Sequence, residues 1–339
     1  MNANQAPETP FDVITTGRIG VDIYPPRTGV PLRAVESFGE FLGGSATNVA
    51  VAAARLGCRA AVISRTGRDP FGEYCRQALT AEFGVDARWV TEVPEYPTPV
   101  TFCEIIPPDD FPLYFYQLPK SPDLEIHSKE LNLAAICAAR IFWMTGTVLC
   151  EQPSRTATMA ALAARSEART AKEAGAGAAQ TATVFDLDWR PMFWHSGPEE
   201  ARAYYTQALR HATVSVGNLE ECALATGERE PRACAEALLA AGVELAVVKQ
   251  GPKGVLAVHR DGGEAEVLPH PVEVVNEFGA GDAFGGSLCH GPLSGWDLTA
   301  IMRYANAAGA LVASRRACCS AMPTTAEVDA LLSSAEVPG

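Results

Sequence analysis

The sequence contains no long apolar run and no internal repeat. A membrane-spanning helix needs about 18 or more apolar residues, and no stretch of this chain reaches that length. Residues 1–10 are polar and contain proline, so we expect a disordered tail there and no secretion signal. Without a repeat of about 20 to 50 residues, a solenoid or propeller is excluded.

Positive charge is also scarce. The chain has 27 Lys and Arg against 40 Asp and Glu, a net charge of −13, and no basic run offsets this balance. Wholesale binding to nucleic acid or to an anionic membrane is therefore not expected. The six histidines are scattered without the spacing of metal ligands. An acidic small-molecule substrate would have to be bound by a few local cations.

The ten cysteines show no C-x-x-C spacing, and the adjacent pair Cys318 and Cys319 cannot form the disulfide framework of a chain this long. Metal or redox motifs of that kind are absent. We therefore expect reduced thiols and a cytoplasmic protein.

Extended apolar runs alternate with helical patterns, and 47% of the residues are hydrophobic. This alternation predicts an α/β fold, a mainly parallel sheet sandwiched by helices, in one domain over residues 11–335. The predicted strands are Phe11 to Thr16, Ala60 to Ser64, Ala139 to Met144, Ala182 to Asp186, Ala212 to Val216 and Leu245 to Lys249. The predicted helices are Thr47 to Leu56, Phe71 to Phe83, Thr156 to Ala164, Glu199 to Arg210, Pro231 to Ala241 and Thr299 to Ala313.

Three segments depart from this alternation. Residues 34–42 and 100–117 alternate polar and apolar positions, which predicts a small antiparallel β-sheet lid with one apolar face. Such a lid would cover a substrate site, and it could also form a homodimer. The Ala- and Gly-rich residues 166–183 indicate a helix end followed by a flexible connection.

The turn Gly279-Ala280-Gly281-Asp282 follows an extended run, Val274 to Phe278, and precedes a helix. Its glycines and the helix N-terminus would form an anion cradle from backbone N–H groups. A carboxylate in a phosphate cradle weakens phosphate binding by charge repulsion. Its presence there suggests that it acts on the group being transferred. The turn therefore predicts phosphoryl transfer with Asp282 as the general base.

Two further turns carry polar side chains suited to a sugar. Gly43 and Gly44 precede a helix whose opening turn holds Asn48, an amide that can donate and accept. Asp22 follows a strand and glycine turns, where a carboxylate could accept hydrogen bonds from hydroxyls. Each has a plain alternative, because glycines also cap helices and Asp is common in turns.

Two other strand ends suit a nucleotide. Asn218 and Glu221 lie three apart and could hold a Mg²⁺ hydration shell, Glu221 through water, although Asn-x-x-Glu is also a capping arrangement. Lys249 leads into the turn of Gly251 and Gly254, which could line a nucleotide or simply join a hairpin. Arg190 stands among aromatics and prolines after a strand, where its planar fork could grip a carboxylate instead of forming a surface ion pair.

From Phe11 to Thr325 the chain resembles the ribokinase-like sugar kinases of the phosphofructokinase-B type. The two signatures of that family are similar to Gly43-Gly44-Ser45-Ala46-Thr47-Asn48 and to Gly279-Ala280-Gly281-Asp282-Ala283-Phe284. The resemblance implies ATP and Mg²⁺ as cofactors, Asp282 as base, and Gly279 to Gly281 as the anion hole. It places the sugar on Asp22, Gly43, Gly44 and Asn48, and the nucleotide on Asn218, Glu221, Lys249, Gly251, Gly254 and Asn306.

Many relatives carry Asp-Thr where this chain has Asn276 and Glu277, in a region that helps to hold a monovalent cation such as K⁺. With Ala317-Cys318-Cys319 in the C-terminal part of that site, the requirement for K⁺ stays open.

The run Asp186 to Trp194 is similar to one in kinases of keto-deoxy sugar acids. The opening Gly17 to Pro25 and Asp110 to Tyr116 resemble more closely the 5-dehydro-2-deoxygluconokinase subfamily of myo-inositol breakdown. That implies transfer to the 6-hydroxyl of 5-dehydro-2-deoxy-D-gluconate. The alternatives are a 2-keto-3-deoxygluconate kinase, a ribose or fructose kinase, an NAD(P)-dependent oxidoreductase that uses Gly279-x-Gly281-x-x-x-Gly285, and a non-catalytic sugar or nucleotide sensor.

Overall fold

The computed structural model describes residues 10–107, 110–173 and 181–335, in two compact units. Unit 1 runs to Gly17 and continues from Leu124 to Leu268, and unit 2 comprises Arg18–Asp123 and the chain from Pro269 onward. Most of the expected N-terminal tail, the centre of the Ala- and Gly-rich segment, and residues 108–109 of the predicted lid lie outside the described residues.

Unit 1 is built on a sheet in the order β13-β12-β11-β10-β9-β8-β1. Strands β1, β8, β9, β10 and β11 pair in parallel, and β12 and β13 add an antiparallel edge. The strands are β1 Val13–Thr16, β8 Ile141–Thr145, β9 Ala182–Asp186, β10 Val214–Asn218, β11 Leu245–Lys249, β12 Val255–His259 and β13 Glu264–Val267. The helices are α3 Leu133–Ala138, α4 Ser154–Glu173, α5 Pro198–Leu209, α6 Leu219–Thr226 and α7 Pro231–Ala241. The predicted mainly parallel sheet with helices is confirmed.

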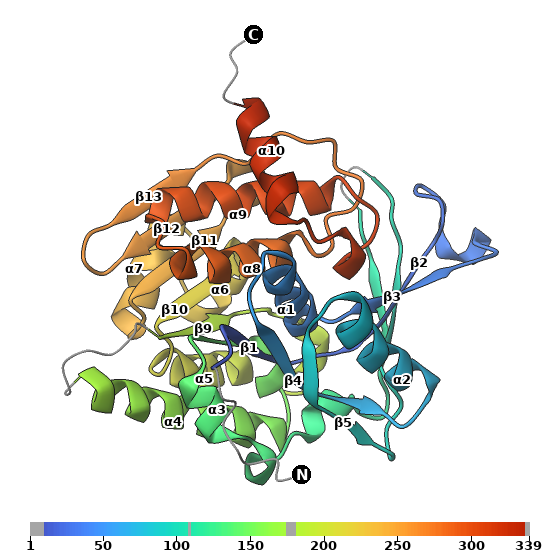
Figure 1. Ribbon diagram of the computed structural model, residues 1–339, viewed down its shortest axis with the longest axis horizontal. Helices are drawn as coiled ribbons and strands as arrows, with labels where there is room; N and C mark the ends of the chain where they lie inside the picture. The colour runs from blue at the N-terminus through green and yellow to red at the C-terminus, as the bar shows by residue number, and fades with distance from the viewer. Residues whose placement is uncertain (1–9, 108–109, 174–180, 336–339) are drawn as a thin grey trace. The chain divides into compact units, whose positions relative to one another are not determined.

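Unit 2 holds the parallel pair β4 Ala60–Gly67 and β5 Asp86–Val93 and five α-helices of its described part. The helices are α1 Ser45–Arg55, α2 Pro70–Gln77, α8 Ala280–Leu293, α9 Leu298–Ala313 and α10 Thr325–Ala335. Helix α8 packs against both α1 and α9 (Figure 1). The close approach of α8 to α1 depends on Gly286, where a Cβ would lie 2.4 Å from the Ala52 side chain. This packing brings the starts of two helices together from opposite ends of the sequence.

A four-stranded sheet in the order β3-β2-β6-β7 makes up the rest of unit 2 (Figure 1). Its strands are β2 Gly20–Tyr24, β3 Gly39–Gly43, β6 Val100–Cys103 and β7 Leu113–Tyr116. The pairs β2–β3 and β6–β7 are antiparallel, as expected for the lid, whereas β2 and β6 run parallel. We call this sheet the lid sheet.

Two details of the lid sheet differ from the sequence prediction. Residues 34–38 are not part of a strand, because the segment before β3 forms a 3-10 helix, Leu32–Ala34, whose backbone bonds locally to Pro31. Strand β2 was predicted as a turn because of its neighbouring glycines. Its backbone instead pairs on both sides, with β3 and with β6. Asp22 is therefore a strand residue and not a turn residue.

Within the described residues, no helix has both the length and the apolar character that a membrane span requires. Each of the ten cysteines carries a free thiol.

Candidate active site

Helix α8 begins directly at the predicted glycine turn. Gly279 is its N-cap, with a left-handed φ of 79° that favours glycine, and Asp282 lies in the first turn. The N–H groups of a first helical turn have no acceptor within the helix, so they present partial positive charge to an anion. The run before the turn is not a strand, since the N–H groups of Val275 and Asn276 both donate to the Ala313 carbonyl at the end of α9.

Asn48 and Asp282 are joined by a direct hydrogen bond. The Asn48 Nδ2 donates to Asp282 Oδ2 at 2.7 Å, across 234 residues of sequence. Asn48 is buried in the first turns of α1, and Gly44 caps that helix. A Cβ at Gly44 would lie 2.4 Å from the Arg18 carbonyl oxygen, so the glycine permits a close backbone approach. The glycine caps the helix, and the Asn48 amide bonds within the protein to Asp282.

Asp22 projects from β2 against Gly43, the first glycine of this turn. A Cβ at Gly43 would lie 2.3 Å from the Asp22 carboxylate, which leaves no room for a side chain. Burial and, to a smaller extent, the charge of Asp282 together raise the pKa of Asp22 to about 7, although the charge of Arg18 opposes the shift. The two carboxylates thus lie close enough for the charge of one to act on the other.

Two consecutive cysteines that the sequence reasoning did not select also lie here. Cys319 Sγ donates to Asn48 Oδ1 at 2.8 Å, and Cys318 Sγ lies 2.8 Å from the Tyr24 hydroxyl. The sequence placed them only in the C-terminal part of the region that holds a monovalent cation in relatives. It gave no sign of these two contacts, because each joins segments more than 250 residues apart along the chain. We call Asp22, Asn48, Asp282 and Cys319 the base cluster.

Unit 1 gathers other predicted residues at one sheet edge. Asn218 and Lys249 are paired neighbours at the carboxyl ends of the parallel strands β10 and β11. The exposed Asn218 forms a capping box with Glu221: its Oδ1 accepts from the Glu221 N–H at 2.9 Å, and Glu221 Oε2 accepts from the Asn218 N–H at 2.7 Å. The capping alternative is therefore what this pair forms. We call Arg190, Asn218 and Lys249 the strand-end edge.

Arg190 follows β9 and forms an ion pair with Asp188, Nη2 to Oδ1 at 3.1 Å. Its side chain is 40% exposed, whereas that of Asp188 is 5% exposed. Asp188 has a φ of 32°, the one positive φ outside glycine in the described chain. Such backbone strain clusters at functional sites. Asp188 is a candidate that sequence reasoning did not single out, since only the fold shows its strain.

The remaining predicted nucleotide contacts fall in different units. Gly251 begins the 3-10 turn Gly251–Lys253 that joins β11 to β12, and the N–H of Gln250 donates to the Gly254 carbonyl at 2.7 Å. These glycines therefore form the hairpin that the sequence left as an alternative. Asn306 lies half-buried on α9 of unit 2.

Asn276 lies fully buried beside the α8 turn. Its Nδ2 donates to the Arg316 carbonyl at 2.6 Å, and its Oδ1 accepts from the Phe278 N–H at 3.1 Å. The amide thus joins the turn to the segment that leads to Cys318. Among the described residues, no group of three or more His, Cys, Asp or Glu side chains could hold a metal ion.

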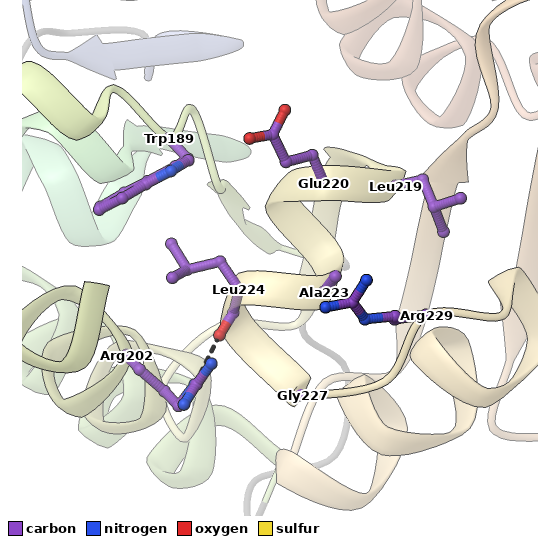
Figure 2. A pocket seen from close by; sticks show the side chains of 8 residues that line it. All are labelled: Trp189, Arg202, Leu219, Glu220, Ala223, Leu224, Gly227 and Arg229. Carbon is purple, nitrogen blue, oxygen red and sulfur yellow. Dashed lines mark hydrogen bonds between the residues drawn. The ribbon is translucent and has the colours of Figure 1, made fainter. Parts of the chain in front are cut away.

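A pocket of about 560 Å³ opens in unit 1 beside α6 (Figure 2). Arg202 Nε donates to the Leu224 carbonyl on its wall at 2.8 Å. None of the predicted site residues lines it, although Trp189 and Leu219 each adjoin one in sequence. The lining residues are Trp189, Arg202, Leu219, Glu220, Ala223, Leu224, Gly227 and Arg229.

The geometry argues against the dinucleotide-dependent oxidoreductase considered above. A dinucleotide fingerprint needs a strand that leads into its glycine turn and leaves the turn free of acidic side chains facing the pyrophosphate. Here no strand precedes Gly279, and Asp282 stands in the first turn of α8.

Comparison with known proteins agrees with this geometry. The model of the pfkB family carbohydrate kinases matches residues 11–325. A 5-dehydro-2-deoxygluconokinase from Clostridium tetani is 32% identical over 325 residues, which cover 94% of this chain and 92% of the relative. Fructokinase from Vibrio cholerae O395, solved with fructose, ADP and a calcium ion, superimposes with a TM-score of 0.79 at 27% identity, over 95% of this chain and 99% of the other.

A protein called Ribokinase II from E. coli, solved with ATP and Mg²⁺, has a TM-score of 0.83 at 23% identity, over 96% of this chain and 99% of that one. At that identity it supports the fold alone. The family match spans both signature turns, the lid sheet and the strand-end edge, and it excludes the oxidoreductase. The chain belongs to the pfkB family of carbohydrate kinases.

Proposed function

We propose that this kinase transfers the γ-phosphoryl group of ATP to the 6-hydroxyl of 5-dehydro-2-deoxy-D-gluconate, with Asp282 as the general base. The observation that carries the proposal is the place of Asp282 in the first turn of α8, fixed by the hydrogen bond from Asn48. A base must reach the acceptor hydroxyl while the transferred group stays near positive charge. One helix start offers both.

The reaction follows from the roles of these side chains. Asp282 takes the proton of the acceptor hydroxyl as that oxygen attacks the phosphorus in line. The N–H groups of Gly279 to Gly281 and the N-terminus of α8 stabilise the charge that develops on the transferred group. Asp22, whose carboxylate packs directly against Gly43, accepts hydrogen bonds from other hydroxyls of the sugar. Closure of the lid sheet would exclude water, which competes as an acceptor.

ATP and Mg²⁺ fit the residues available. The exposed Asn218 and its strand neighbour Lys249 offer an amide and a cation to the nucleotide, with Gly251 and Gly254 of the same unit as further contacts. Bound ATP supplies the transferable group, and Mg²⁺ neutralises phosphate charge. Mg²⁺ keeps several waters when phosphates ligate it, so the protein needs few direct ligands. Glu221 would act through water, because its Oε2 already caps α6.

The choice of a sugar acid rests on Arg190 and on the relatives. Arg190 is partly exposed and pairs with Asp188, and its planar fork can bind an incoming carboxylate. The C. tetani relative is named for phosphorylation of 5-dehydro-2-deoxygluconate, which supports that substrate over 2-keto-3-deoxygluconate. The similarity to a fructokinase, at 27% identity, makes neutral sugars the alternative class of substrate.

An ADP-release assay with ATP and Mg²⁺ tests this proposal. The acceptors are 5-dehydro-2-deoxygluconate, 2-keto-3-deoxygluconate, fructose and ribose. We expect the highest kcat/KM for the first. Preference for a neutral sugar would contradict the role of Arg190 and leave the kinase class intact. ATP binding without ADP release on any acceptor would indicate a sensor instead.

The lid sheet is also proposed as a dimer contact. Its strand β7 exposes the aromatic rings of Tyr114 and Tyr116, and Phe38 beside β3 is exposed as well. Phe38 and Tyr116 both pack against Phe102 of β6, and exposed aromatics grouped in this way favour association. Light scattering after size exclusion should give twice the chain mass, and Tyr116→Ser should reduce it.

A further inference from the structure

The base cluster contains a donor that the proposed reaction does not yet use, the Cys319 thiol. It donates to Asn48 Oδ1 at 2.8 Å, and Asn48 Nδ2 donates to Asp282 Oδ2 at 2.7 Å. Three segments far apart in sequence are thus joined in one short chain of hydrogen bonds. Cys319 and Asn48 are 0% and 4% exposed, so bulk water does not compete for the bond between them, whereas Asp282 is half-buried.

We propose that Cys319 is a positioning residue for phosphoryl transfer: its thiol fixes the orientation of the Asn48 amide, which in turn holds the Asp282 carboxylate toward the acceptor hydroxyl. This inference rests on the proposed role of Asp282 as the base. Cys319 itself touches neither the sugar nor the nucleotide in this scheme.

The direction of the hydrogen bonds follows from the chemistry of the groups. An ionised carboxylate only accepts, so the NH₂ of Asn48 must face Asp282, and Oδ1 must face Cys319. A flipped amide would point its oxygen at the carboxylate and leave the thiol facing two donors. The carboxylate therefore sets which way the amide faces, and the thiol reinforces that orientation by donating to Oδ1.

The thiol is held in its donating form. Burial raises the pKa of Cys319 well above its ordinary value, and the charges of Asp22 and Asp282 raise it further. A thiolate would face the amide oxygen and two carboxylates. The protonated thiol, which can donate, is therefore the favoured form of Cys319 in this environment.

The preceding residue contacts the other signature turn. A Cβ at Gly279 would lie 3.1 Å from Cys318 Sγ, so Cys318 packs directly against the N-cap of α8. Its Sγ also lies 2.8 Å from the hydroxyl of Tyr24 in β2. The adjacent cysteines thus contact the starts of α1 and α8 at once, which explains how a short C-terminal segment can set the geometry of the base.

The test compares three variants. Cys319→Ala removes the donor, Cys319→Ser retains one, and Cys289→Ala is the control, because Cys289 is an equally buried thiol of α8 without a contact to the base cluster. We expect Cys319→Ala to lower kcat about 5- to 50-fold, the scale of losing one oriented hydrogen bond, with the KM for ATP unchanged. Cys319→Ser should stay within about threefold of the wild type, and Cys289→Ala should match it.

The pH profile of kcat separates positioning from mere packing. A donor to the ionised form lowers the pKa of a carboxylate, so without an oriented Asn48 the acidic limb should move to higher pH in Cys319→Ala. Asp22, Arg18 and Cys318 also surround this site, but they are identical in all variants. An unmoved limb, or equal losses in the Ala and Ser variants, would overturn the proposal.

A double-mutant cycle tests whether Cys319 acts through Asn48. If Cys319 acts only through Asn48, then Asn48→Ala with Cys319→Ala should be no slower than Asn48→Ala alone. Additive losses would overturn the inference. Thermal unfolding checks folding, and Cys319→Val replaces the Ala variant should that one not fold. If Asp282→Asn keeps its activity, the proposed base is wrong. If Cys319→Ala has wild-type activity while Asp282→Asn is inactive, only the positioning role is wrong.

Discussion

The base cluster and the strand-end edge satisfy their polar groups in opposite ways. In the base cluster, Asn48 bonds to partners 234 and 271 residues away, and all of these atoms are buried or partly buried. At the strand-end edge, Asn218 bonds to a residue three positions away and Arg190 to one two positions away. Asn218 is exposed and Arg190 is 40% exposed.

This difference distinguishes side chains that are held in one fixed geometry from side chains that stay available to a ligand. Groups that must hold a base in one geometry are fixed by long-range bonds in a buried site, where each bond is strong and its loss is costly. Groups that meet a ligand keep local partners that can be exchanged, and they remain accessible to solvent. Changes in the base cluster should therefore reduce turnover, and changes at the strand-end edge should weaken substrate binding.

The largest effect should come from Asp282→Asn. Removal of a general base costs about 10² to 10⁴ in rate, so kcat should fall by that factor while ATP affinity, measured by calorimetry, stays the same. The control is Glu73→Gln, which removes an exposed first-turn carboxylate from α2. Normal turnover in Asp282→Asn would mean that the base cluster does not control turnover, and it would contradict the proposed contrast with the strand-end edge.

Asp22→Asn tests the buried charge of the base cluster through stability. The pKa of Asp22 is raised from 3.8 to about 7, so its contribution to folding is complete below pH 3.8 and is lost as the pH rises through about 7. The loss amounts to about 1.4 kcal/mol per pH unit across that window, or up to about 4 kcal/mol.

Urea unfolding of both proteins at several pH values measures this loss. Asp22→Asn should be more stable than the wild type at pH 8, and this difference in unfolding free energy should be smaller at pH 5. The KM for the acceptor sugar should rise in the variant. A stability difference that does not change with pH would mean that Asp22 is not held in a buried, charge-repelling environment.

Arg190→Gln tests the strand-end edge. We expect the KM for the sugar acid to rise about tenfold, the value of one charge-assisted contact, with kcat and the KM for ATP little changed. Arg88→Gln is a matched control, because Arg88 also pairs with an Asp two residues before it, Asp86, on an exposed surface. If both variants leave the KM for the sugar acid unchanged, Arg190 forms only a surface ion pair and does not bind the substrate.

The smallest effect should follow from removing K⁺. The Asn276 amide donates to the Arg316 carbonyl, so that oxygen already has a donor partner and does not need a cation. Replacing K⁺ by tetramethylammonium at constant ionic strength should change kcat less than about twofold, below the scale of a lost hydrogen bond. Asn276→Asp should make the rate depend on K⁺. A strong dependence in the wild type would contradict this assignment.

Much of the local structure was predictable. Strands β9 and β11 and helix α7 match the predicted ranges residue by residue, because hydrophobic periodicity and glycine or proline boundaries are local signals. The start of α8 at Gly279 follows from the glycine turn in the same way. Strand β2 was missed, since its pairing with β3 and β6 depends on residues outside any local window.

The sequence by itself determined the class of fold and the two glycine signatures, because helix starts, strand ends and their turn residues are encoded over a few neighbouring positions. Only the tertiary structure decided that Asn48 bonds to Asp282, that Cys319 orients Asn48, and that Asp22 lies in a strand against Gly43. These contacts depend on the packing of α1 against α8, and a chain's local pattern does not specify which distant segments meet.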